Sequence, residues 1–231
     1  TALNSMQYWG DTFDKDPEYA LEGLKHQTAT MAEELQNCGV QVSLAPVLDL
    51  NLGLSEVIGD RSFHSNPEKL SQLAKCVIDT MHQQGMPTIG KHFPGHGGVA
   101  LDSHSDLPID HRSWDEIWQN DMLPYRHLTR QLDAIMPAHI IFDQIDDKPA
   151  CFSKHWIQEV LQNKLQYKGL VMTDCLSMAG AASMGSYEER GYLALEAGCD
   201  ILTLCNDRNA LYQVLDNIRQ YASLTSQEAT N

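Results

Sequence analysis

The stretch KHFPGHGGVALDSHSDLP, residues 91–108, concentrates side chains that can move protons or bind polar ligands. It contains three histidines, a lysine and two aspartates, together with three glycines and two prolines. Glycine and proline at this density interrupt helices and strands, so the stretch predicts a long loop. Imidazoles and carboxylates on one loop suit general acid–base chemistry, because histidine titrates near neutral pH.

Asp102 and His104 are spaced to work as a pair. Across a tight turn, the carboxylate can accept a hydrogen bond from one ring nitrogen, which fixes the tautomer and raises the basicity of the imidazole. His104 could then give a proton to a leaving group and later take one back. A surface histidine without a catalytic role is the alternative, and the clustering of histidines in this stretch argues against it.

Asp174 stands at the end of the apolar run GLVMTD, directly before CLSMAG. A carboxylate at the end of a buried strand is held rigidly, and it could act as a nucleophile, a general base or a metal ligand. Aspartate is also a favoured helix N-cap, so a structural role at the start of a following helix is the alternative. The position of Asp174 leaves both readings open.

Cationic side chains lie near the same predicted strand ends. Lys91 and His92 close a strand, and a lysine there is expected to meet a carboxylate or a sugar hydroxyl, because burying an unpaired ammonium is costly. Arg61 lies in the loop GDRSFH, where an ordinary salt bridge is the alternative.

A metal site is the competing interpretation of the loop. The residues of types that zinc accepts are His92, His96, Asp102 and His104. Pro94 and Gly95 interrupt the helical spacing that would bring two of these histidines onto one face. We therefore predict that the site uses no metal and no cofactor, and that His96 is structural.

Helical and strand patterns alternate along the chain. Helices are predicted at residues 17–38, 67–84, 113–130, 153–166, 186–197 and 207–222, and strands are predicted to begin near residues 40, 87, 133, 169 and 199. Each strand is short, mostly apolar and preceded by a helix, which is typical of a parallel sheet buried on both faces. The pattern fits a doubly wound sheet or part of a (β/α)₈ barrel. No glycine-rich phosphate-binding turn follows any strand, which argues against a nucleotide site.

The polar residues fall where the predicted strands end. In chain order they are Asp49, Lys91 with His92, His139, Asp174 and Asn206. In a parallel α/β fold these carboxyl ends form one rim, and sites are built there. The loops that follow the strands are also longer than those that precede them. The sequence therefore predicts an α/β fold of the TIM-barrel type with its site on this rim.

The composition excludes some classes of partner. Hydrophobic residues make up 42% of the 231 residues, and the net charge is −15, so a sizeable core is expected and nucleic acid is a poor partner. No apolar stretch reaches the roughly 18 residues needed to span a bilayer, and no signal peptide is recognisable, so no membrane partner is expected. The six scattered cysteines predict reduced thiols in the cytoplasm.

Several motifs resemble those of glycoside hydrolase family 3. They are KHFPGHG, the DSH that begins eleven residues after the lysine, TDCLSMAGA and GSYEERG, with further likeness in SLAPVLDLN, GDRSFHSNP, DAIMPAHIIF and AGCDILTLCN. The likeness runs in order from about residue 20 to residue 218. It is greatest to the bacterial β-N-acetylglucosaminidases of peptidoglycan recycling.

The resemblance implies a retaining hydrolase that removes non-reducing terminal β-linked N-acetylglucosamine from muropeptides. Asp174 would match the family's nucleophile, which forms a covalent glycosyl-enzyme. His104 would match the general acid/base, an unusual choice among glycosidases, and Asp102 would orient it. The residues that would match the family's sugar-binding positions are Arg61, Lys91 and His92.

The resemblance also has consequences for domain organisation. It implies that residues 1–231 form a single domain, the C-terminal part of a TIM-barrel domain that lacks its first strands and the family's DQEGGRVxR segment. Cys175 stands where the family commonly has a second acidic residue after the nucleophile. An open barrel exposes two sheet edges, so we expect self-association. A catalytically silent remnant is the alternative to an active enzyme.

Overall fold

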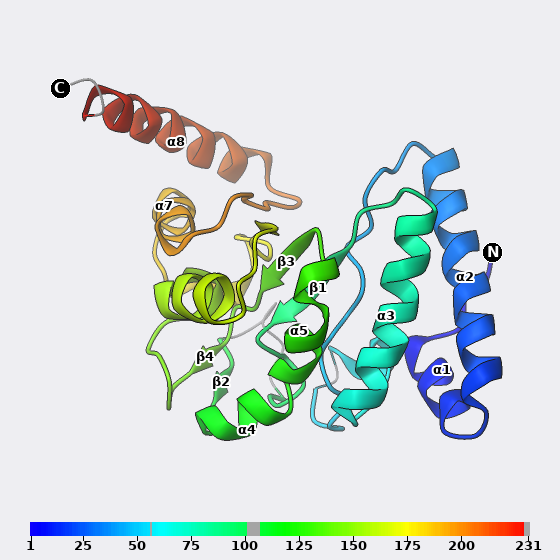
Figure 1. Ribbon diagram of the computed structural model, residues 1–231. Coiled ribbons are helices and arrows are strands. Elements are labelled where there is room, and N and C mark those ends of the chain that lie inside the picture. The colour runs from blue at the N-terminus through cyan, green and yellow to red at the C-terminus, as the bar shows by residue number, and fades with distance from the viewer. Residues whose placement is uncertain (56, 101–106, 229–231) are drawn as a thin grey trace.

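The computed structural model describes residues 1–55, 57–100 and 107–228 (Figure 1). Its α-helices are α1 (Met6–Phe13), α2 (Pro17–Asn37), α3 (Pro67–Gln83), α4 (Trp114–Gln119), α5 (Met122–Leu128), α6 (Ala179–Ala182), α7 (Tyr187–Ala197) and α8 (Arg208–Glu228). Its strands are β1 (Ile89–Phe93), β2 (Ile109–Asp110), β3 (Ala134–Pro137), β4 (Ile141–Phe142) and β5 (Leu170–Val171). Three short 3₁₀ helices, η1 (Gly59–Arg61), η2 (Thr129–Gln131) and η3 (Ala150–Phe152), and the π-helix η4 (His155–Lys164) complete the described elements.

The main sheet is parallel and follows the order of the chain. β1 pairs with β3, and β3 pairs with β5. Single parallel bridges extend the sheet on both sides, from Val47 to Lys91 and from Met172 to Ile201. Five parallel segments therefore lie side by side in sequence order, close to the five predicted positions. Within the described part of the chain, no pairing joins the first segment to the last, so this stretch of sheet is open.

The first segment is less regular than the prediction of a strand from about residue 40. Ile89 N donates to Ala45 O at 2.7 Å, Lys91 N donates to Pro46 O at 3.2 Å, and Leu48 N donates to Lys91 O at 2.6 Å. Pro46 carries no N–H and cannot complete the ladder in the other direction. The segment is therefore extended but bridged at a single residue.

The two faces of the sheet pack in different layers. A small buried cluster on one face consists of Ile89, Ala134 and Met136, with Met172 against it. Alternate strand residues such as Ile135 and Val171 belong instead to the large core. A small inner layer and a helix-covered outer layer are the packing of a (β/α)₈-type barrel, as the sequence predicted.

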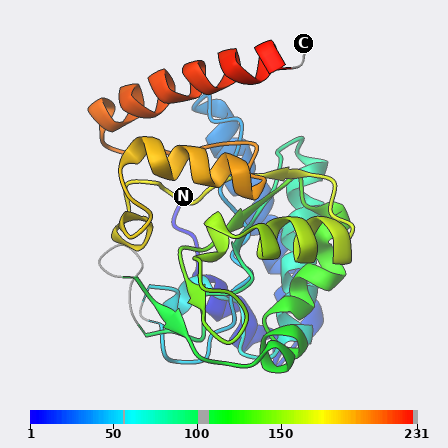
Figure 2. The same cartoon turned by 90° about the vertical axis from the view of Figure 1, so that its left-hand side faces the viewer.

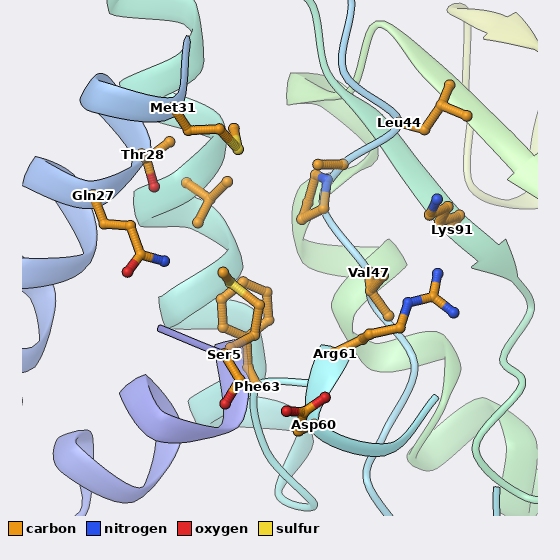
Figure 3. A pocket seen from close by; sticks show the side chains of 14 residues that line it. Ser5, Gln27, Thr28, Met31, Leu44, Val47, Asp60, Arg61, Phe63 and Lys91 are labelled. Atoms are coloured by element: carbon orange, nitrogen blue, oxygen red, sulfur yellow. The ribbon is translucent and has the colours of Figure 1, made fainter. Parts of the chain in front are cut away.

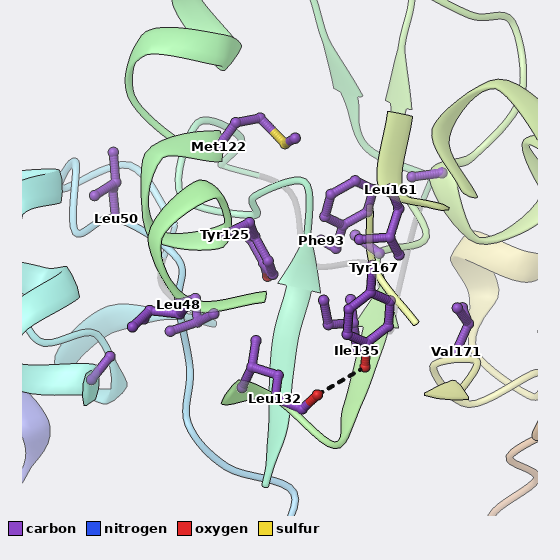
Figure 4. Packing of buried hydrophobic residues seen from close by; sticks show 14 of the residues in the cluster. Leu48, Leu50, Phe93, Met122, Tyr125, Leu132, Ile135, Leu161, Tyr167 and Val171 are labelled. Atoms are coloured by element: carbon purple, nitrogen blue, oxygen red, sulfur yellow. Dashed lines mark hydrogen bonds between the residues drawn. The ribbon is translucent and has the colours of Figure 1, made fainter. Parts of the chain in front are cut away.

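Aromatic side chains fix the outer layer (Figure 4). The ring of Phe93 on β1 meets the ring of Tyr125 on α5 edge-on at 5.1 Å, and it meets the ring of Trp156 on η4 at 6.0 Å. Tyr167 donates its hydroxyl to Leu132 O at 3.3 Å, just before β3. β1 and β3 are thus held by side chains from three neighbouring elements, which sets the positions of the strand ends.

The helices begin at capping residues. The N-caps whose side chains accept backbone hydrogen bonds are Ser5 for α1, Asp16 for α2, Asn66 for α3, Ser113 for α4 and Ser186 for α7. Pro17 and Pro67 occupy the first helical positions of α2 and α3, where the missing N–H costs nothing. These signals explain why the predicted boundaries of α2, α3 and α7 are accurate.

Other helices depart from the prediction. The single helix predicted over residues 113–130 is wrong, because the chain breaks at Asn120 into α4 and α5 and then into η2. The break lets the buried carboxylate of Asp121 accept hydrogen bonds from Arg112 Nη1 and Nη2, at 2.8 and 3.2 Å. The helix predicted over residues 153–166 is the π-helix η4, and α1 was not predicted.

The helices are arranged around the sheet in chain order. α1, α2 and α3 lie together at one end of the molecule, and α7 and α8 lie at the other (Figure 1). A view turned by 90° also shows α8 running beside α7 (Figure 2). No helix within the described residues is long and apolar enough to cross a membrane.

Candidate active site

A cavity of about 200 Å³ lies at the carboxyl ends of the parallel segments. Four predicted site residues line it, namely Arg61, Lys91, His92 and Asp174. They come from the loop after the first segment, from β1, and from the segment after β5. The structure thus brings together side chains that are up to 113 positions apart, from residue 61 to residue 174.

Asp174 is partly buried at the wall of this cavity. Its Oδ1 accepts a hydrogen bond of 2.7 Å from the Cys175 amide. Burial alone would raise the pKa of Asp174, but the charges of His92 and His139, the Cys175 amide and the charge of Lys91 together lower it. α6 begins only at Ala179, so the alternative reading of Asp174 as a helix N-cap is wrong.

His92 is held by a buried carboxylate that the predicted site did not include. Asp49 Oδ2 lies 2.7 Å from His92 Nδ1, and both Asp49 oxygens accept from the His92 amide at 3.1 and 3.2 Å. The His96 amide also donates to Asp49 Oδ1 at 2.7 Å. With Nδ1 committed to Asp49, Nε2 is the ring nitrogen of His92 that a ligand can use. Asp49 therefore fixes both the orientation and the tautomer of His92.

Lys91 and Arg61 form a cationic wall. Burial lowers the pKa of Lys91, and the neighbouring charge of Arg61 lowers it further, while the carboxylates of Asp174 and Asp49 oppose this. Arg61 Nη1 donates to Val57 O at 3.1 Å. Ammonium and guanidinium groups placed in this way can donate hydrogen bonds to hydroxyl oxygens.

The same two cations line a second cavity of about 290 Å³ (Figure 3). There, side chains of α2, including Thr28 and Met31, lie opposite Val47. Its walls are mostly apolar, and they also include the carboxylate of Asp60.

His139 supports the segment that contains Asp174 and Cys175. Its side chain is fully buried and stacks on the ring of Phe152 at a centroid distance of 5.3 Å. Its Nε2 lies 3.1 Å from the Cys175 carbonyl oxygen, to which it donates. Burial lowers the pKa of His139, against the opposing charge of Asp174. His139 thereby positions the residue that hydrogen-bonds Asp174.

A second support comes from α7. Arg190 Nη1 donates to Leu176 O at 2.8 Å, and its Nε donates to Gly185 O at 2.9 Å. The first turn of α7 is closed by a capping box between Ser186 and Glu189. The segment after Asp174 is therefore tied to a well-capped helix.

Asp102 and His104 lie outside the described residues. The chain on their N-terminal side is tightly packed, because a Cβ at Gly97 would lie 2.0 Å from Leu50 O and one at Gly98 would lie 2.1 Å from Arg112 Nη2. Only glycine permits these close approaches.

The C-terminal side is anchored by the same arginine. Arg112 donates to Asp110 from Nε, at 3.0 and 3.1 Å, and from Nη2, at 2.7 Å. It also reaches Asp121, so its pKa is raised despite its burial. Described residues on both sides of Asp102 and His104 thus converge on Arg112.

The competing metal site finds no support among the described residues. Within them, no group of three or more histidine, cysteine, aspartate or glutamate side chains could hold a metal ion. The His92 and His96 rings meet edge-on, with centroids 5.7 Å apart. The other two proposed ligands, Asp102 and His104, are not described, so the absence of a metal stays a prediction.

Sequence reasoning missed three contributors to the site. Asp49 and His139 were placed on the rim but given no role, and Cys175 was noted only as a departure from the family pattern. For Asp49, an aspartate inside the apolar run LAPVLDL was a usable signal, because a buried carboxylate requires partners. No local signal pointed to the bond between His139 and Cys175, because these residues are 36 positions apart.

The chain is similar in sequence and fold to known proteins. A β-hexosaminidase of Tolumonas auensis is 52% identical over 191 residues, which cover 82% of this chain and 57% of that protein. The crystal structure of native NagZ from Neisseria gonorrhoeae superposes with a TM-score of 0.87 at 40% identity, covering 94% of this chain and 62% of that one. A second structure, of the same enzyme in complex with N-trifluoroacetyl-D-glucosamine, gives the same values.

The chain spans 57% to 62% of the lengths of these relatives. Residues 1–230 match the family described as glycosyl hydrolase family 3 N terminal domain. The parallel sheet with its helix-covered outer face agrees with the barrel-type fold of these structural neighbours. The chain therefore belongs to glycosyl hydrolase family 3.

Proposed function

We propose that this chain carries the site of a retaining β-N-acetylhexosaminidase that removes non-reducing terminal N-acetylglucosamine from peptidoglycan fragments in the cytoplasm. Family membership, relatives named β-hexosaminidase and a related complex with N-trifluoroacetyl-D-glucosamine support the proposal. The observation that carries it is the position of Asp174. This partly buried carboxylate lines a cavity together with Lys91, His92 and Arg61, and the charges and the amide around it lower its pKa.

In the first step, Asp174 attacks the anomeric carbon of the terminal sugar. A bond forms between a carboxylate oxygen and this carbon while the glycosidic C–O bond breaks. The departing oxygen takes a proton from the protonated ring of His104. Asp102 orients this ring and stabilises its positive charge before the transfer. A lowered pKa suits Asp174 to this role, because only the ionised carboxylate is nucleophilic.

In the second step, water replaces Asp174. His104 now acts as a base and removes a proton from the water, whose oxygen bonds to the anomeric carbon while the ester bond to Asp174 breaks. Two inversions return the sugar with its original configuration. Arg61, Lys91 and His92 Nε2 bind the sugar hydroxyls during both steps, and Asp49 keeps His92 in position.

The test of the proposed function is to trap the intermediate. The chain should hydrolyse a chromogenic β-N-acetylglucosaminide, and a 5-fluoro glycoside should leave one sugar attached to the peptide that contains Asp174. Peptide mass spectrometry identifies the labelled residue. A label on another carboxylate, or turnover that a chelator abolishes, would contradict the proposal.

His104→Ala should discriminate between leaving groups. For natural substrates we expect a loss of roughly 10²- to 10⁴-fold in kcat/KM, because no acid then protonates the departing oxygen. For substrates whose leaving group needs no proton, the loss should be much smaller. His111→Ala is the matched control, since His111 is an exposed histidine paired with Asp143. Equal losses of kcat/KM for both types of substrate would show that His104 is not the general acid.

The chain should also associate with itself. Val40, Val42 and Leu44, which lead into the bridged residue Val47 at one edge of the sheet, are 40%, 42% and 43% exposed, and Ile201 lies exposed at the other edge. Unpaired edges of this kind recruit further strands. Sedimentation velocity should show concentration-dependent association that Val42→Lys weakens. Monomers at every concentration would contradict it, and a chain that associates but turns over no substrate would favour the silent alternative.

A further inference from the structure

Two thiols lie beside Asp174 that the proposed reaction does not use. Cys175 follows Asp174 directly, and Cys205 follows the neighbouring segment of the sheet. Both side chains line the cavity of about 200 Å³ that holds Asp174. Cys175 is partly buried and Cys205 is exposed, so a small molecule in the cavity can reach both.

Backbone hydrogen bonds hold the two cysteines next to each other. Thr173 N donates to Ile201 O and Leu176 N donates to Thr203 O, each at 2.9 Å. The Cys205 amide donates to Cys175 Sγ at 3.1 Å. Neighbouring strands lie about 4.8 Å apart, which falls within the range of roughly 4.4–6.8 Å between the Cα atoms of disulfide partners.

The side chains are also poised to react. Cys175 Sγ lies 3.0 Å from Ser177 Oγ, and Ser177 Oγ donates to Cys205 O at 3.3 Å. Burial and the adjacent Cys175 side chain raise the pKa of Cys205. The Cys205 amide donates to the Cys175 sulfur, and the raised pKa of Cys205 makes that thiol the weaker nucleophile, so we assign Cys175 as the first nucleophile and Cys205 as the resolving thiol.

The remaining cysteines lack this combination of exposure and a neighbouring thiol. Cys151 and Cys199 are both buried, and Cys199 Sγ donates to Cys151 O at 3.6 Å inside the core. Cys38 is exposed at the end of α2, and Cys76 is partly buried on α3, where its Sγ donates to Leu21 O at 3.5 Å.

We propose that Cys175 and Cys205 form a peroxide-sensitive dithiol whose reversible oxidation to a disulfide switches off the Asp174 site; this inference rests on the proposed function. Cys175 sulfur attacks one oxygen of hydrogen peroxide, the O–O bond breaks, and the departing hydroxide takes the thiol proton to give water and a sulfenic acid. Cys205 sulfur then attacks the sulfenic sulfur, an S–S bond replaces the S–O bond, and a second water leaves. Two thiols are oxidised and one peroxide is reduced to two waters.

The disulfide acts on the nucleophile through the backbone of Cys175. The Cys175 amide holds Asp174 Oδ1 at 2.7 Å, and its carbonyl accepts from His139 Nε2 at 3.1 Å. When the Cys175 side chain rotates towards Cys205 to form the disulfide, its sulfur loses its contacts with Ser177 Oγ and the Cys205 amide. This rotation also changes the shape of the cavity wall. Small displacements of a reacting group cost large factors in rate, so we expect kcat/KM to fall about tenfold or more.

The experiment compares peroxide-treated and untreated chain. After catalase removes the peroxide, hydrolysis of a chromogenic N-acetylglucosaminide and the masses of non-reduced peptides are measured on the same sample. A peptide pair joined through Cys175 and Cys205 should appear as activity falls, and dithiothreitol should reverse both changes. Cys205→Ser and Cys175→Ser should each lose the joined peptide and the peroxide sensitivity, scored as the ratio of treated to untreated activity.

Cys38→Ser is the matched control, because it removes an exposed thiol away from the cavity and should keep full sensitivity. Absence of the joined peptide, or its formation without loss of activity, overturns the inference. Equal inactivation of Cys205→Ser and the unmodified chain also overturns it. A reduced chain that hydrolyses no N-acetylglucosaminide contradicts the proposed function instead, and the peptide masses still decide whether the disulfide forms.

Discussion

Replacing Asp174 with alanine is expected to lower kcat by about 10⁴-fold or more, the scale seen when a covalent nucleophile is removed. The loss is large because no other described carboxylate lines the cavity with Lys91 and His92. No other described carboxylate there can therefore form the covalent intermediate. Steady-state hydrolysis of a chromogenic N-acetylglucosaminide measures the effect. Unfolding by urea should show that the variant remains folded.

The same variant offers a positive readout. Azide is small enough to enter the space that the missing carboxylate leaves, so it should partly restore turnover and give an α-glycosyl azide. Asp207→Asn is the matched control, because Asp207 Oδ1 accepts a 2.9 Å bond from Ala210 N at the start of α8, which an asparagine can also accept. If Asp174→Ala kept most of its activity, or if azide gave a β-product, Asp174 would not be the nucleophile.

Replacing Asp49 with alanine should lower the free energy of unfolding by roughly 3–5 kcal/mol, the scale for breaking a buried charge pair. Asp49 is 1% exposed, and its two oxygens accept from the His92 and His96 amides and from the His92 ring. Without Asp49, these donors are left buried and unsatisfied. Urea unfolding measures the loss, and activity should fall as well, since His92 then has no fixed orientation.

The contribution of Asp49 to the free energy of unfolding should depend on pH. Burial would raise the pKa of Asp49, but the charge and hydrogen bond of His92, the charge of His96 and the backbone bond of His92 lower it below its usual value. The carboxylate therefore contributes its full stability above the unfolded pKa, near 3.9, and loses it as the pH falls through the lower folded pKa. The difference between the wild type and Asp49→Ala should shrink below about pH 4.

Asp16→Asn is the control for this prediction. Asp16 caps α2 by accepting one bond from Tyr19 N at 3.0 Å, and asparagine caps equally well. Its unfolding free energy should match that of the wild type. A loss for Asp49→Ala no larger than that of the Asp16 control would show that the bonds to His92 and His96 contribute little.

Local patterns predicted the elements that depend on local chemistry. Pro17 and Pro67, each directly after a capping residue, allowed the starts of α2 and α3 to be predicted. Short apolar runs allowed the positions of β1, β3 and β5 to be predicted. Because parallel strands align their carboxyl ends, residues as distant in the chain as Arg61 and Asp174 were expected on one rim, and they line one cavity.

Features set by long-range contacts escaped prediction. The break between α4 and α5 follows from the pairing of Asp121 with Arg112, which periodicity does not reveal. The bonds from Asp49 to His92 and from His139 to Cys175 join residues 43 and 36 positions apart. Such pairs depend on which strands become neighbours, so they can be recognised only once the sheet order is known.

Arg190 connects α7, a helix on the outside of the molecule, with the segment that follows Asp174. Its guanidinium donates to Gly185 O, just before α7, and to Leu176 O, so it ties the start of α7 to the chain beyond Asp174. Under the proposed function, selection for faster turnover can therefore act on α7 residues that do not contact the substrate. Mutations that weaken the α7 cap would then also slow catalysis, so the reaction constrains the evolution of this outer helix.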